Sequence, residues 1–581
     1  MKARFFLILV TAATASEIAA ENSIHPWAAA ELVWPSDPVA RMWQSYQLMM
    51  RGSAVEPEVL SESWPKSVGE ICHILEENDS NRESSNSASN AIRAFCEDKK
   101  YPRPFILKVD FGAYPIERRY PLGKPFEHFD GSWVSELVNP EEALTWSEIP
   151  STIQTELSYP ISDKGYLHFR IGLRRDLSAW DRDALGLNLP LSDKEVDLNE
   201  PSQGYFHFEN GYFGFTVGRF PVHWSPSPEF GLALSDAVPF HNAAEFALKM
   251  PHARYRFLIS SLNPWLEGTP LGDTSSEAYP PGSEQYLQRH YRIDHGASIF
   301  HKRIYAEDIK TLFAHRVEGE WGPVGLGITE TEVIGGKVPD LRDAGPFVFF
   351  HNDFKDGYTN SALSLDASLS LPAGFSLAGE LYLDDVQFAE TEGEGNTASL
   401  LGYLAAVRHA FSAHGWAVSQ SLHAIRTDPY LYGYLQPLST MASRHILASN
   451  NQVDGDPLFV DRYVVDYPMG YLRGGDAFDF WYRAEGWYGS RVQAAFTAAL
   501  LAQGVVDIHT PYQNYYSSGH DSPTGTAERE VRLGLEGGFR VWKGLSVHGG
   551  VGWQGIRNAD HRSGNDLQRV QINSGAAYRL P

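Results

Sequence analysis

Hydrophobic side chains alternate with polar ones in several long segments of this chain. Between residues 167 and 174 apolar residues take every second place, and His, Arg, Gly and Arg fill the gaps. The alternation returns between residues 363 and 371 and between residues 531 and 541. Because a strand directs successive side chains to opposite faces, each segment has one apolar and one polar face. Soluble sandwiches rarely sustain such long strands, whereas a transmembrane β-barrel needs this pattern, with lipid outside and a polar lumen inside.

The composition agrees with a β-barrel, and the net charge makes nucleic acid an unexpected partner. The 581 residues include 51 glycines, and 13% are aromatic, as expected of many turns and of rings at membrane interfaces. Lysine and arginine total 48 and aspartate and glutamate 72, a formal charge of −24. Nucleic acid is not an expected partner, since proteins that bind it usually carry a basic face.

Residues 1–20 are predicted to be a secretory signal peptide. Lys2 and Arg4 precede a short apolar stretch, and small residues follow at two usable cleavage sites. A buried N-terminal strand is the alternative. Export together with lipid-facing strands predicts the cell outer membrane, where outer-membrane lipid surrounds the barrel.

Residues 21–103 are predicted to form a small helical subdomain in the periplasm or at the barrel mouth; a disordered leader is the alternative. Ser36 and Pro38 provide a helix start, and apolar residues recur at helical spacing up to residue 50. Further helices are expected near residues 68–75 and 88–96. An exported protein with two cysteines usually pairs them. Cys72 and Cys96 are therefore expected to form a disulfide, with two free buried thiols as the alternative.

Residues 104–581 are assigned to the barrel. Short turns are predicted at Asn210-Gly211, which is a strong hairpin signal, and at residues 372–374 and 543–544. Long polar stretches alternate with these turns in the sequence. This agrees with barrels of this class, which place short turns in the periplasm and long loops outside. At roughly 10 residues per strand, the sequence predicts an all-β transmembrane antiparallel β-barrel of about 14–18 strands.

The C-terminal residues 574–580 resemble the signal that the barrel-assembly machinery reads during biogenesis, although the chain ends on Pro581 and not on an aromatic residue. Signs of enzyme chemistry are weak. Residues 517–521 contain the residue types of a catalytic triad, but triads are assembled from distant segments. Residues 454–456 lack the further ligands of a calcium loop. No catalytic residue, metal or cofactor is predicted.

One stretch of the chain is more distinctive. A Gly-Arg strand end at Gly218 and Arg219 leads into a Pro-rich bend around Trp224, and residues 232–240 read Leu-Ala-Leu-Ser-Asp-Ala-Val-Pro-Phe. With looser matches near residues 300–303, 325–330, 381–385 and 468–470, this order resembles the Wzi capsule-assembly family of outer-membrane barrels. The resemblance spans residues 150–490, and Ser225 departs from it where relatives often have Trp or Gly.

The resemblance implies an 18-stranded barrel with a periplasmic helical bundle and a lectin-like role in holding capsular polysaccharide at the cell surface. We therefore favour 18 strands. Sugars are bound by aromatic faces and hydrogen-bond donors, and acidic glycans also favour Arg. Candidate glycan-binding residues of the right type are Arg170, Arg174, Arg219, Trp224 and Arg303. Each has a structural alternative, because lumen Arg residues commonly pair with carboxylates and Trp commonly lies at the membrane interface.

The predicted function is therefore binding or organising a surface polysaccharide, and the alternative is a porin or solute channel. Folded-in loops and a lumen packed with Arg, Glu and Tyr favour the first. An open polar pore favours the second. An outer-membrane lipid-modifying enzyme is a third class, for which the sequence shows no nucleophile set.

Overall fold

The computed structural model describes residues 32–34, 38–51, 64, 66–68, 71–72, 92–93, 95–97, 105–113, 124–125, 150–162, 164–174, 187–189, 203–263, 309–339, 359–385, 400–433, 437–449, 461–489, 491–508, 522–542 and 544–580. The predicted signal peptide and the segments 454–456 and 517–521 lie outside these residues.

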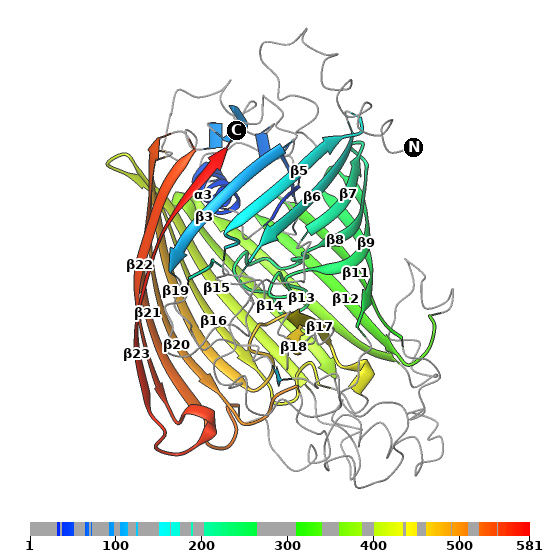
Figure 1. Cartoon of the computed structure of the whole chain (residues 1–581). Helices are drawn as coiled ribbons and strands as arrows, with labels where there is room; N and C mark the ends of the chain where they lie inside the picture. The colour runs from blue at the N-terminus through cyan, green and yellow to red at the C-terminus, as the bar shows by residue number, and fades with distance from the viewer. Residues whose placement is uncertain are drawn as a thin grey trace.

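Eighteen antiparallel strands of the described chain close into one barrel (Figure 1). Neighbouring strands pair in order around the wall, and the circle closes where β23 pairs with β3. The prediction of an all-β antiparallel barrel is confirmed, with the favoured strand number. The barrel strands are β3 (Phe105–Ala113), β5 (Ile153–Pro160), β6 (Gly165–Leu173), β7 (Gln203–Glu209), β8 (Phe213–Phe220), β9 (His241–Met250), β10 (Ala253–Leu262), β11 (Lys310–Trp321), β12 (Val324–Gly335), β13 (Thr359–Leu371), β14 (Phe375–Asp385), β15 (Leu400–Ala413), β16 (Trp416–Thr427), β19 (Ala477–Tyr488), β20 (Val492–Gln503), β21 (Glu528–Trp542), β22 (Leu545–Arg557) and β23 (Leu567–Leu580).

The alternation of the sequence separates the two faces of the barrel wall. On β6, Leu167 and Ile171 are 44% and 41% exposed, whereas His168 between them is 4% exposed. On β23, Ile572 is 71% exposed and its neighbour Gln571 only 9%. A closed wall that is apolar outside and polar inside is the architecture of a barrel in a lipid bilayer. The barrel therefore spans the outer membrane with its apolar face toward lipid.

Short turns gather at one end of the barrel. The β7–β8 hairpin turns through Asn210 and Gly211, and φ is +87° at Gly211, which glycine adopts without steric cost. The 3-10 turn η7 (Pro372–Gly374) joins β13 to β14. Gly374 has no room for a side chain, because a Cβ there would lie 2.1 Å from the backbone oxygen of Ala410. Both turns are predicted from the sequence and are confirmed.

The helix α3 (Pro38–Arg51) lies inside the barrel at this short-turn end and contacts η7 (Figure 1). Arg41 Nε donates to Glu485 Oε2 of β19 over 2.9 Å. Trp43 is 2% exposed and meets Trp64 edge-to-face, with ring centroids 5.7 Å apart. The helix predicted from apolar spacing is confirmed here. No helix among the described residues is both long and apolar enough to cross a bilayer.

The N-terminal segment is held against the inner wall at further points. Cys72 and Cys96 form a disulfide with Cα atoms 5.9 Å apart. Both belong to a buried cluster that includes Ala417 of β16 and Trp487 of β19. Two short strands, β1 (Leu32–Val33) and β2 (Lys66–Ser67), pair in this region. These strands are not predicted from the sequence, since two residues are too few to show a periodicity.

Two connections from the opposite end of the barrel fold into the lumen. Residues 221–240 join β8 to β9 and form what we call the first lumen segment. The described residues of 428–476 join β16 to β19 and form the second lumen segment. The second segment carries a hairpin that extends into a small sheet of β17 (Ala442–Ser449), β18 (Asp461–Pro468) and β4 (Lys124–Pro125).

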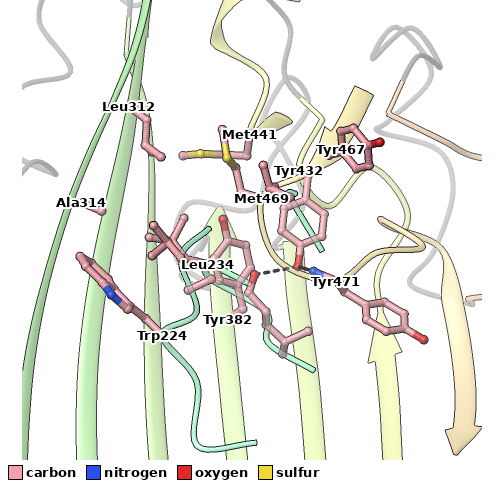
Figure 2. Close-up of a cluster of buried hydrophobic side chains, with 14 of the residues drawn as sticks. Trp224, Leu234, Leu312, Ala314, Tyr382, Tyr432, Met441, Tyr467, Met469 and Tyr471 are labelled. Carbon is pink, nitrogen blue, oxygen red and sulfur yellow. Dashed lines mark hydrogen bonds between the residues drawn. The ribbon is translucent and has the colours of Figure 1, made fainter. Parts of the chain in front are cut away.

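Side chains of both lumen segments and of the barrel wall form one buried cluster. Figure 2 shows part of this cluster, with Tyr432 and Tyr471 of the second segment and Leu234 of the first. Tyr382 of β14 and Leu312 of β11 belong to the same cluster and are completely buried. A hydrophobic core therefore lies inside this barrel, where an open channel would hold water.

Candidate functional site

The first lumen segment is held to the wall by Glu380 of β14. Its Oε1 accepts hydrogen bonds from Ala233 N over 3.0 Å and from Ser364 Oγ over 2.8 Å. Its Oε2 accepts from Leu232 N over 3.1 Å and from Ser225 Oγ over 2.9 Å. Buried backbone amides that lack a partner cost free energy. Glu380 thus allows this non-strand backbone to lie in the lumen.

Tyr432 joins the two lumen segments (Figure 2). Its hydroxyl donates to the backbone oxygen of Leu232 over 2.7 Å and accepts from Tyr471 N over 3.0 Å. The two backbones approach so closely beside it that a Cβ on Gly470 would lie 1.9 Å from the Leu232 oxygen. Only glycine fits at position 470. The two lumen segments therefore stabilise each other's position by direct contact.

His223 fixes the bend of the first lumen segment. Nε2 donates to the backbone oxygen of Ser227 over 2.6 Å, and Nδ1 lies 3.0 Å from Asp236 Oδ1. Burial alone would lower the pKa of His223, but the Asp236 carboxylate and the Ser227 carbonyl raise it overall above its usual value. Each ring nitrogen lies against an acceptor oxygen, and an imidazole that donates at both nitrogens satisfies the two acceptors. Trp64 N also donates to the His223 backbone oxygen over 2.9 Å, so the N-terminal segment touches this bend.

A cavity of about 870 Å³ lies in the lumen beside the first lumen segment, between strands β23, β3, β5, β6 and β7 on one side and β19 to β22 on the other. Sites for small organic ligands have volumes of this order. Glu229 of the first lumen segment lines the cavity. Burial would raise the pKa of Glu229, but His423 and Arg408 lower it overall, so the group is a carboxylate.

One side of the cavity, which we call the basic wall, is built from the contiguous strands β23, β3, β5, β6 and β7. Period-two alternation turns its polar side chains inward. Of the residues that line the cavity, the carboxylates Glu229, Asp236 and Glu536 all come from other elements. The lining polar side chains of these strands are therefore amides and cations, and Glu156 of β5 contacts two of them, Gln154 at 2.5 Å and Arg170 at 3.4 Å. The polar lining residues of the basic wall are Lys108, Gln154, Arg170, Arg174, Gln203, Gln571 and Asn573.

The opposite side is aromatic and balanced in charge. The rings of Phe230 and Trp481 lie 5.4 Å apart between centroids. The Arg532 guanidinium lies 5.8 Å from the Trp481 ring centroid, and its Nε donates to Glu530 over 2.7 Å. Two further lining arginines also pair with carboxylates, Arg473 with Asp479 and Arg483 with Glu485.

The predicted residues Arg170 and Arg174 both line the cavity, on the basic wall. Arg170 Nε lies 3.4 Å from Glu156 Oε1, so the structural alternative of an ion pair applies to it as well. Arg303 lies outside the described residues.

Arg219 and Trp224 are placed differently. Arg219 Nε donates to Asn242 Oδ1 over 3.0 Å, and its guanidinium stacks 4.2 Å from the centroid of Phe240, which lines the cavity. Trp224 is fully buried in the lumen cluster, and its backbone N donates to the oxygen of Leu234 over 2.9 Å. Arg219 thus supports the cavity through Phe240, and Trp224 supports the fold of the first lumen segment.

Several lining residues are missing from the sequence-based candidates, among them Lys108, Gln203, Gln571 and Trp481. Each occupies an inward position of an alternating strand, so the period-two pattern places them in the lumen. The pattern does not say which lumen positions face a cavity and which face folded-in chain. That information comes from the lumen segments, which have no periodicity.

Comparison with solved structures identifies the class of barrel. The chain is similar to Wzi of Escherichia coli, an outer-membrane carbohydrate-binding β-barrel involved in Group 1 capsule assembly, with a TM-score of 0.54. The match covers 95% of this chain and 99% of that chain at 13% identity. This chain is an outer-membrane β-barrel. At this identity the likeness shows the shared fold alone.

Two outer-membrane proteins match less well. OccD3 (OpdP) of Pseudomonas aeruginosa has 9% identity and a TM-score of 0.35, over 82% of this chain and 91% of that chain. An anion-selective porin from Comamonas acidovorans has 8% identity and a TM-score of 0.31, over 82% and 98%. No protein-family model matches the chain, and no curated protein matches it in sequence.

Proposed function

We propose that this barrel binds or organises a surface polysaccharide at the outer membrane, as a Wzi-like protein and without catalysis. The observation that carries the proposal is the filled lumen, in which the two lumen segments form a core and leave a lined cavity. Aromatic faces, amides and charged side chains surround that cavity. These are the groups that bind sugar rings, hydroxyls and carboxylates.

The structural likeness supports this proposal in a second way. Wzi is described as a carbohydrate-binding barrel, and the match extends over nearly the whole of both chains. A porin or solute channel is the rival function. The lumen segments count against it, because hydrogen bonds through Glu380 and Tyr432 hold them across the lumen.

We further propose the division of the chain into a signal peptide (1–20), a periplasmic helical subdomain (21–103) and the barrel (104–581). The place of α3 supports the second part. The helix lies at the end where the turns are short, and outer-membrane barrels direct their short turns to the periplasm.

Deleting the gene in the producing bacterium is expected to move surface polysaccharide from the cells into the medium, because its binding site on the outer membrane is lost. The measurement compares cell-bound and released polysaccharide by a total-sugar assay at equal cell density. Expression of the wild-type gene from a plasmid is expected to restore cell-bound material. Unchanged retention in the deletion strain would count against the proposed function.

A further inference from the structure

We infer that Arg529 and Arg557 form a phosphate-binding site on the outer wall of the barrel, and that its ligand is a phosphorylated glycolipid of the outer leaflet. The site faces the lipid and is independent of the glycan binding proposed above. It rests on the register of the two arginines, on their height along the wall, and on the absence of partners for them among the described residues.

The two arginines lie directly opposite each other on neighbouring strands. Arg529 of β21 pairs with Arg557 of β22 in the antiparallel register, and the two strands run side by side in the wall (Figure 1). Opposed side chains of such a pair project from the same face, with Cβ atoms about 4.5–5.5 Å apart. Like charges directly opposite each other destabilise a sheet. An anion bound between the two guanidinium groups removes this repulsion.

Both arginines project from the outer face of the wall. On β21, Arg529 shares the outer face with Val531, which is 38% exposed. Glu528 and Glu530 lie on the other face and are 1% and 4% exposed. Arg557 is exposed like Arg529. Charged side chains on the lipid face of a barrel are costly at the centre of the bilayer and tolerated near its surface.

The height of the pair corresponds to the outer surface of the membrane. Only two residues separate β21 from β22 at the short-turn end, and the pair lies at the opposite end of these strands, which barrels direct outward. Trp553 lies below Arg557 on the same face, and its ring covers Gly555, where a Cβ would lie 2.8 Å from Trp553 Cη2. Tryptophan is enriched at the membrane interface. The two arginines therefore lie level with the headgroups of the outer leaflet, where phosphorylated glycolipids are found.

Neither guanidinium makes a hydrogen bond or an ion pair within the part of the chain that the structure describes. The loop from β22 to β23 carries Asp560 and Asp566, but neither carboxylate forms an ion pair with Arg529 or Arg557. Asp566 Oδ1 accepts instead from Asn558 N over 3.2 Å. All donors of both guanidinium groups are thus available to a ligand. Arginine suits phosphate in particular, because its planar fork can donate two parallel hydrogen bonds to phosphate oxygens.

The wall below the pair can hold acyl chains. Outward side chains of β22 and β23 are exposed and apolar there, with Val551 at 48%, Val570 at 70% and Ile572 at 71%. A phosphorylated glycolipid uses both parts of this surface, its phosphate on the arginines and its chains on the apolar wall. Free phosphate uses the arginines alone. The continuous surface therefore favours the lipid as the ligand.

The test measures binding of diphosphoryl lipid A and of dephosphorylated lipid A to the delipidated full-length barrel in nonionic detergent, by native mass spectrometry. The diphosphoryl lipid is expected to bind about tenfold more tightly or better, because its contacts with arginine are charge-assisted. The Arg529→Gln, Arg557→Gln double variant is expected to lose this preference. The matched control is Arg491→Gln, Arg540→Gln, which removes two exposed arginines near the short-turn end and is expected to keep the preference.

Equal binding of the two lipids by the wild type would overturn the phosphate site. A preference that survives in the double variant would overturn its assignment to Arg529 and Arg557. If the double variant does not fold, Arg557→Gln alone takes its place and is expected to lose most of the preference, and an unchanged preference would contradict the assignment. Excess inorganic phosphate is expected to leave the diphosphoryl lipid bound, since its acyl chains are held as well. Complete displacement would overturn the glycolipid as the ligand and leave a site for free phosphate.

Discussion

A Glu380→Ala variant is expected to form steady ion channels in planar lipid bilayers, where the wild-type barrel conducts little. The substitution removes the acceptor of four hydrogen bonds, two of them from backbone amides of the first lumen segment. Each buried amide left unpaired costs about 1–3 kcal/mol. A loss of about 3 kcal/mol raises the undocked fraction on the order of a hundredfold. The lumen segment then leaves its place more often, and water and ions enter.

The control for this experiment is Glu209→Ala, which removes a carboxylate that pairs with Lys249 at the short-turn end of β7. Its conductance is expected to equal that of the wild type. Gly470→Val tests the same contact from the second lumen segment, because its side chain would occupy the place of the Leu232 oxygen. Large steady channels in the wild type, or a closed barrel in both lumen variants, would refute the role of these contacts.

An Arg316→Leu variant is expected to lose about 3–5 kcal/mol of stability, the usual cost of breaking a buried ion pair from one side. Arg316 of β11 is 1% exposed. Its Nη2 donates to Asp366 Oδ1 over 3.0 Å, its Nε donates to Glu318 Oε2 over 2.9 Å, and its Nη1 donates to Thr329 Oγ1 over 2.9 Å. Leucine leaves the buried Asp366 carboxylate without the guanidinium that binds it, whereas Glu318 keeps Arg254, whose Nε lies 3.9 Å from Glu318 Oε1. The measurement is the urea midpoint of unfolding in detergent micelles, followed by tryptophan fluorescence.

The double variant Arg316→Leu, Asp366→Asn is expected to recover most of that loss, because it removes both charges of the pair and leaves Glu318 with Arg254. Lys249→Ala is the control and is expected to cost about 1 kcal/mol or less, since it breaks a pair near the rim of the barrel. If Arg316→Leu unfolds at the same urea concentration as the control, the ion pairs of Arg316 do not contribute the expected free energy of unfolding.

The wall of the barrel could be predicted from the sequence, because strand geometry is local. Alternation places Leu167 outside and His168 inside without knowledge of any other strand. The hairpin at Asn210-Gly211 and the amphipathic helix α3 follow from equally short stretches. Strand number depends on chain length and turn spacing, which limit the range. The resemblance to Wzi was needed to favour one value within it.

The contents of the lumen could not be predicted in the same way. Glu380 and Leu232 are 148 residues apart in sequence, and no local pattern joins them. Trp224 has the residue type of a sugar contact, but its bend packs into the lumen core and covers the ring completely. Arg170 and Arg174 could be placed in the lumen from the alternation. Their position beside a cavity depends on where the first lumen segment lies.

The most direct test of the account is a binding titration of the purified full-length barrel with polysaccharide extracted from the surface of the producing cells. We expect saturable binding of this polysaccharide. Absence of any saturable binding, in protein that is folded by circular dichroism, would contradict the account.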